Sequence, residues 1–139
     1  MTIQRMDHVG IVVDDLAAAI EFFVDLGLEP QGDGSVEGAW VDRIVGLDDI
    51  RAQFAFMETP DGHGRLELVK FLAPPSPDGD RQPPANTPGL RHVAFAVVAR
   101  LRARGAELVG TVERYQDSYR LCYVRGPEGI IIELAEQIG

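Results

Sequence analysis

One apolar motif led by a histidine occurs twice in this chain of 139 residues. It reads HVGIVVDD at residues 8–15 and HVAFAVVA at residues 92–99. A second pair of similar segments follows in the same order, PDGHGRLEL at residues 60–68 and PEGIIIEL at residues 127–134. Because the landmarks recur in one order, the sequence predicts a duplicated module. The fold must therefore accommodate two related copies of one supersecondary unit.

The first copy reads as a strand, a helix and three further strands. A β-branched strand at 7–13 precedes the segment LAAAIEFFVDLG, whose apolar residues recur at helical spacing, with Asp14 or Asp15 as the N-cap and Gly27 as the C-cap. The further strands are predicted at 39–46, 52–58 and 65–71, the last two as a hairpin around the turn TPDGHG.

The second copy follows a segment at residues 73–89 that holds six of the nine prolines, which predicts a semi-rigid linker. The copy is expected to contain strands at 91–98, near 107–113, at 119–125 and at 129–135, with a short helix at about 99–104. It is shorter than the first copy between the leading strand and the end of the helix, and we place the shortening at 98–99.

The predicted fold class is therefore α+β, with two βαβββ modules. The modules are expected at residues 1–72 and 90–139, joined by the Pro-rich linker at 73–89.

Composition excludes several classes of protein. A net charge of −9 argues against a nucleic-acid or anionic-membrane surface. The single Cys122 excludes an internal disulfide and is expected to be a buried strand thiol. No apolar run approaches the roughly 20 residues of a membrane span, and no signal-peptide pattern is present, so a cytoplasmic protein is predicted.

Side-chain alternation places each repeated histidine on the less bulky face of its strand. His8 shares its face with a glycine, and His92 shares its face with two alanines. Glu67 lies in the predicted strand RLEL and Glu133 in the apolar run IIIEL. A carboxylate in such a strand is costly if it is buried without a partner. Each glutamate therefore needs a cation, a hydrogen-bond network or solvent.

Two imidazoles and two carboxylates can satisfy one another around one divalent ion such as Zn, Ni, Co, Fe or Mn. An octahedral ion would keep two positions for water or a bidentate oxygen substrate, and a glutamate could act as the base. The alternative is that the histidines are structural and the glutamates face solvent. A pocket for an anionic substrate could be lined by Arg120, Arg125, Tyr115 and Tyr119, although these residues could equally serve in the core or at the surface. An apolar pocket wall could be formed by Trp40, Phe54 and Phe56, for which core packing is the alternative.

The paired histidine strands, the two glutamates and the turn before the last strand resemble the vicinal oxygen chelate superfamily, the glyoxalase/bleomycin resistance/dioxygenase group. The resemblance covers nearly the whole chain. Within the superfamily, the set of two histidines and two glutamates is most similar to that of glyoxalase I. The resemblance implies that the two modules form a cupped mixed sheet around a metal site. It also implies that His8, Glu67, His92 and Glu133 are the four metal ligands. It also implies a lyase or isomerase that moves a proton on a hemithioacetal, or a similar small molecule, through an enediolate.

By the same resemblance Glu133 is the first choice for the catalytic base and Glu67 the second, and a homodimer is expected. Two alternatives remain open: an isomerase similar to methylmalonyl-CoA epimerase, and a metal-free drug-binding resistance protein. Epimerases of that kind tend to carry glutamine at the position of Glu67, which argues for the glyoxalase-like reaction.

Overall fold

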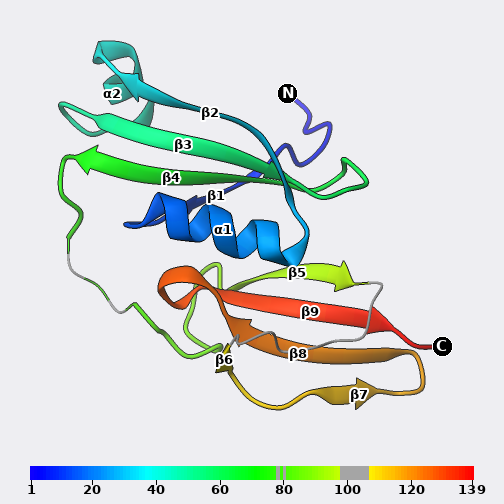
Figure 1. The fold of residues 1–139 in the computed structure, drawn as a ribbon. Helices are drawn as coiled ribbons and strands as arrows, with labels where there is room; N and C mark the ends of the chain where they lie inside the picture. Colours follow the sequence, from blue (N-terminus) through cyan, green and yellow to red (C-terminus); the bar gives the residue numbers. More distant parts are fainter. Residues whose placement is uncertain (78, 80, 98–106) are drawn as a thin grey trace. The chain divides into compact units, whose positions relative to one another are not determined.

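The structure, a computed structural model, describes residues 1–77, 79, 81–97 and 107–139. The chain divides into two compact units, Met1–Asp78 and Gly79–Gly139, and each unit has its own β-sheet (Figure 1). Both sheets are mixed, and helices are few, so the predicted α+β class is confirmed. The division falls inside the Pro-rich segment. The helices in the described part of the chain are all too short or too polar to span a bilayer.

The first unit is a four-stranded sheet with two helices. Its elements are β1 (Val9–Val12), α1 (Leu16–Leu26), β2 (Glu29–Glu37), α2 (Ala39–Val45), β3 (Arg51–Glu58) and β4 (Arg65–Ala73). The strand order is β1-β4-β3-β2, in which β1 runs parallel to β4 and the other neighbours are antiparallel. The parallel pair sets the first histidine segment beside the strand that carries Glu67.

Helix α1 covers one face of this sheet. Asp15 caps it by accepting a hydrogen bond from the amide of Ala18 at 3.0 Å, and Gly27 ends it with a φ of 108° in the left-handed region. The apolar stripe turns Ala19 and Phe23 inward, where both are fully buried. Glu67 lies on the opposite face of the sheet, which this helix leaves uncovered.

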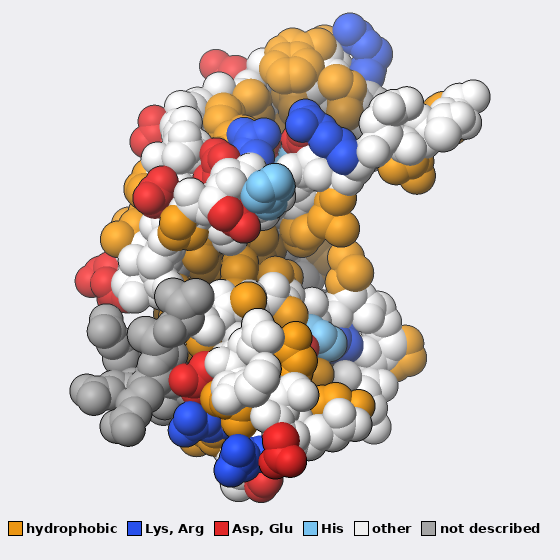
Figure 2. Space-filling view, turned by 90° about the vertical axis from the view of Figure 1, so that its right-hand side faces the viewer, with side chains coloured by type: hydrophobic (Ala, Val, Ile, Leu, Met, Phe, Trp, Pro, Cys, Tyr) orange, Lys and Arg blue, Asp and Glu red, His pale blue; other side chains and the backbone are white. Residues whose placement is uncertain are grey.

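The strand predicted at 39–46 is wrong, because these residues form helix α2. The apolar residues in this stretch suggested a strand. In the structure, the carboxylate of Asp42 accepts hydrogen bonds from the amides of Asp49 and Ile50 at 3.1 and 2.9 Å. These bonds tie the helix to the turn before β3. A single helical residue, Val41, is buried with Ile50, and the rest of the helix stays at the surface. Figure 2 shows hydrophobic side chains gathered at the top of the view, where Figure 1 places α2.

Strand β2 has no counterpart in the sequence-based prediction. Its sequence EPQGDGSVE contains proline and glycine, which are poor strand formers. Pairing with β3 supplies the missing stabilisation, because Gly32 lies opposite Phe56 and Gly34 lies opposite Phe54. The ring of Phe54 covers Gly34 so closely that an added Cβ would lie 2.9 Å from it. The glycine therefore makes room for an aromatic ring from the next strand.

The second unit is a five-stranded sheet. Its elements are β5 (His92–Val97), β6 (Glu107–Leu108), β7 (Glu113–Tyr115), β8 (Tyr119–Arg125), a 3-10 turn η1 (Pro127–Gly129) and β9 (Ile131–Gln137). The order is β5-β9-β8-β6, with β7 also paired to β8, and β5 runs parallel to β9. The strand predicted near 107–113 is in fact two short strands, β6 and β7. The predicted helix at 99–104 and the shortening at 98–99 lie outside the described residues.

Candidate metal centre

The two predicted glutamates occupy the same register position in the two sheets. Glu67 on β4 lies opposite Gly10 of the parallel strand β1, two residues after His8. Glu133 on β9 lies opposite Ala94 of the parallel strand β5, two residues after His92. Each glutamate therefore stands on the strand next to its histidine segment, on the face toward which the histidine alternates.

In the second unit the histidine and the glutamate are in direct contact. Nε2 of His92 lies 3.1 Å from Oε2 of Glu133, and their side chains are 38% and 20% exposed. The ring of Tyr123, which lies opposite Glu133 on β8, packs against the His92 ring with centroids 5.0 Å apart. The imidazole is thus held between a carboxylate and an aromatic ring, and it remains accessible from outside.

In the first unit His8 is held by a different carboxylate. Its Nδ1 lies 2.7 Å from Oδ2 of Asp7, and its ring meets the edge of Phe56 with centroids 5.4 Å apart. Phe56 lies opposite Glu67 on β3, as Tyr123 lies opposite Glu133 in the other unit. An aromatic residue beside each glutamate is therefore a further element of the repeat.

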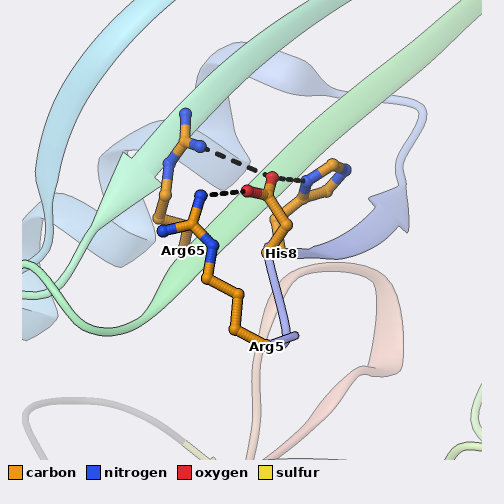
Figure 3. A network of polar contacts seen from close by, with 4 residues as sticks. Arg5, His8 and Arg65 are labelled. Carbon is orange, nitrogen blue, oxygen red and sulfur yellow. Dashed lines mark hydrogen bonds and ion pairs between the residues drawn. The ribbon is translucent and has the colours of Figure 1, made fainter. Parts of the chain in front are cut away.

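Two arginines surround the carboxylate of Asp7. Arg5 Nη2 lies 3.3 Å from Oδ1 and Arg65 Nη1 lies 3.6 Å from Oδ2, and Figure 3 shows both guanidinium groups pointing toward the same carboxylate as the ring of His8. The hydrogen bond from His8, followed by the charge of Arg65, holds the pKa of Asp7 below its ordinary value. Asp7 is therefore an ionised acceptor at neutral pH.

The donor pair of the second unit has a spacing that fits a divalent ion. Two atoms bound to one ion at about 2.1 Å, at angles between octahedral and tetrahedral, lie roughly 3.0–3.4 Å apart. The separation of 3.1 Å between Nε2 of His92 and Oε2 of Glu133 falls in this range. Within residues 1–77, 79, 81–97 and 107–139, no three His, Cys, Asp or Glu side chains are grouped closely enough to bind a metal ion.

A model of the glyoxalase/bleomycin resistance protein/dioxygenase superfamily matches residues 7–123 of the chain. The chain belongs to this superfamily. The crystal structure of a glyoxalase family protein from Bacillus cereus is 48% identical with a TM-score of 0.93, and the match covers 100% of this chain and 97% of that one. The membership predicted from the paired motifs is thus confirmed.

More distant members show how widely the fold is shared. A glyoxylase/bleomycin resistance protein/dioxygenase domain from Frankia sp. EAN1pec is 17% identical with a TM-score of 0.67, covering 98% of this chain and 99% of that one. An antibiotic binding protein from Streptomyces sp. CB03234 is 18% identical with a TM-score of 0.62, covering 99% and 98%. At these identities the similarity concerns the fold alone. A comparison with curated proteins gives no match.

A shallow pocket opens beside the second histidine–glutamate pair of this superfamily member. Its volume is about 320 Å³, and Glu133 and Tyr123 form part of its wall. The remaining described lining residues are Val109, Gly110, Thr111, Leu121 and Cys122. The pocket therefore offers a small molecule a largely apolar surface with one carboxylate at its edge.

Two arginines considered for a pocket that binds an anionic substrate make contacts within their own unit, and Arg120 also lines a surface pocket with Arg114 and Ile138. Nε of Arg120 lies 3.2 Å from Oε2 of Glu136. Arg125 donates hydrogen bonds to the carbonyl oxygens of Gly129 and Pro83 at 2.8 and 3.1 Å. Both guanidinium groups are therefore engaged within their own unit.

Sequence reasoning missed two residues that surround the histidines in this superfamily member. Asp7 precedes His8, but Arg91 precedes His92, so the repeat gave no signal for this carboxylate. Tyr123 did leave a signal, because it precedes Glu133 at nearly the same interval at which Phe56 precedes Glu67. A comparison of the two hairpins residue by residue would have found it.

Proposed function

We propose that this chain is a metal-dependent, glyoxalase-like lyase or isomerase. It moves a proton between adjacent carbons of a small substrate, such as a hemithioacetal, that presents two neighbouring oxygens. His8, Glu67, His92 and Glu133 hold one divalent ion of the group Zn, Ni, Co, Fe or Mn. The observation that carries the proposal is the 3.1 Å contact between His92 and Glu133, made at the register position that His8 and Glu67 repeat.

Glu133 is the residue proposed to transfer the proton. It is partly buried at 20% exposure, it lies at the edge of the pocket beside β8, and Tyr123 holds the neighbouring imidazole in place. A carboxylate there can take the proton from a carbon next to a carbonyl and return it to the neighbouring carbon. Glu67, also partly buried, is the second candidate for this base. The bound ion supplies the electrophile that polarises the substrate oxygens.

We further propose that the protein is a cytoplasmic homodimer that acts on a small-molecule substrate. Sedimentation or light scattering of the purified protein measures the assembly state, which we expect to be two chains.

The substitution Glu133→Gln tests the proposed reaction. We expect the purified protein to convert a hemithioacetal formed from methylglyoxal and a thiol, and the variant to lose about 10²–10⁴-fold in kcat/KM. Glu107→Gln is the matched control, because Glu107 is an exposed carboxylate on β6 of the same unit. Metal content by elemental analysis is measured alongside. A variant that keeps both metal and activity would contradict the role of Glu133.

The same assay separates the two alternatives. Epimerisation of methylmalonyl-CoA without turnover of hemithioacetals would identify an epimerase. The Streptomyces neighbour is an antibiotic binding protein on the same fold. A protein that holds no metal, and binds an aromatic drug equally well with and without chelator, would be a binder of that kind and would refute the enzyme.

A further inference from the structure

The two histidines have different neighbours behind their rings. Nδ1 of His8 lies 2.7 Å from the carboxylate of Asp7, which is the residue before it. His92 is preceded by Arg91, whose Nε is buried without a hydrogen-bond partner among the described residues. The contact made by His92 instead uses Nε2, directed at Glu133. A carboxylate behind the ring is therefore a property of the first unit that the repeat does not share.

We propose that Asp7 is a positioning residue that fixes His8 as an Nε2 ligand for the divalent ion. The inference rests on the proposed function, because it concerns how one ligand of that ion is held. An ionised carboxylate accepts hydrogen bonds and donates none, so Nδ1 of His8 must carry the proton in this contact. Nε2 is then the nitrogen whose lone pair is available in the neutral ring.

The surroundings of Asp7 explain why this orientation is stable. Arg65 pairs with the carboxylate at 3.6 Å, and its guanidinium lies over the ring of Phe56 at 4.5 Å from the centroid. The same ring of Phe56 meets the His8 imidazole edge-on. The four side chains therefore form a closed circuit in which each one restricts the next, and Figure 3 shows the polar part of it.

This circuit defines what Asp7 does for the ion. A hydrogen bond from the far nitrogen of a ligating imidazole to a carboxylate sets the tautomer and makes the near nitrogen more basic, and its loss typically costs 10–100-fold in metal affinity. Without Asp7, His8 would lose the acceptor that keeps the proton on Nδ1. Phe56 alone would then restrict the ring, and it distinguishes neither nitrogen.

The experiment uses the full chain with Asp7→Ala and Asp7→Asn, and with Asp33→Asn as the matched control. Asp33 is an exposed carboxylate on β2 of the same unit. Nitrogen-15 NMR of the metal-free protein reports the tautomer of His8, and competition of Zn²⁺ or Ni²⁺ with a chromophoric chelator reports affinity. We expect Asp7→Ala to shift the tautomer toward Nε2–H and to weaken metal binding about 10–100-fold. Asp7→Asn should weaken it less because it keeps an acceptor oxygen, and Asp33→Asn should change neither.

Three different results would overturn the inference. If the wild type binds the ion and Asp7→Ala binds it equally tightly, the positioning role fails while the proposed function stands. If the wild type binds no divalent ion, both fail together. A loss of affinity without any change in the tautomer signal would assign Asp7 to folding, and thermal melting of each variant identifies that case.

Discussion

The reactivity of the Cys122 thiol reports on the packing of the second sheet. The thiol is 4% exposed on β8, and burial raises its pKa above the ordinary value of 9.0. We expect native protein to react with a thiol reagent such as DTNB far more slowly than protein in guanidinium chloride, because the reactive thiolate is disfavoured. Stoichiometric labelling of native protein at the denatured rate would contradict this packing.

The same thiol gives a pH dependence of defined sign. The folded state holds the Cys122 proton more tightly than the unfolded state, so the free energy of unfolding falls as the pH rises above the ordinary thiol value of 9.0. Denaturant titrations at pH 8 and pH 10 test the sign of the effect. The thiol cannot be blocked by alkylation in the unfolded state without disturbing the packing, because the buried position of Cys122 cannot accommodate the added group.

At the level of residues the proposed ligands could be selected from the sequence, but their surroundings could not. His92 and Glu133 stood out because strand alternation and the repeat pointed to them together, and the structure brings them into contact. Asp7 and Arg65 act across the sheet surface, where sequence distance says nothing about contact. Arg65 reaches Asp7 because the parallel pairing of β1 and β4 sets their starts side by side.

At the level of elements, the hairpins were predictable and the edges were not. AQFAFME and RLELVKF pair as expected in β3 and β4, since alternation and a turn signal specify a hairpin locally. Strand β2 depends on an aromatic ring covering Gly34, which is a tertiary contact. Helix α2 depends on Asp42 binding amides in the following turn. Neither interaction is visible in a window of sequence.

The Pro-rich segment is another element whose behaviour depends on tertiary contacts. Arg125 on β8 donates to the carbonyl oxygen of Pro83 and to that of Gly129, so it joins the segment to the turn before β9. Gly129 has a φ of 87°, and an added Cβ there would collide with the carbonyl oxygen of Arg81. The close approach of two backbones therefore requires glycine at this position. The part of the segment near Pro83 is accordingly packed against the turn before β9 within the second unit.

Loss of the hydrogen bonds made by Arg125 is expected to destabilise the protein and to expose the Pro-rich segment to proteolysis. Arg125→Gln cannot bond both carbonyl oxygens with a charged donor, so the free energy of unfolding should fall by about 1–3 kcal/mol. Release of the segment should also speed tryptic cleavage after Arg81 severalfold. Limited proteolysis followed by mass spectrometry measures that cut, with Arg114→Gln on β7 as the control for removing a surface arginine from the same unit. Unchanged cleavage after Arg81 would show that Arg125 does not hold the segment.

At the level of the whole molecule, the repeat persists in register more clearly than in sequence. Both units pair the histidine segment in parallel with the glutamate strand, and both set an aromatic residue opposite the glutamate. They differ in what surrounds the histidine, with a carboxylate behind His8 and the ligand-like contact at His92. The two units are thus non-equivalent around their histidines.

The number of ions bound per chain decides whether the two units serve one site or two. If four side chains hold one ion, the wild type binds one equivalent, and His8→Ala or His92→Ala each weakens that same ion. The effects are then non-additive, because a second substitution acts on a site already impaired. Elemental analysis and calorimetric titration with Zn²⁺ or Ni²⁺ measure the stoichiometry, and His63→Ala, on an exposed turn, is the matched histidine control. If each histidine–glutamate pair held its own ion, the wild type would bind two and each single variant would keep one, which would refute the shared site.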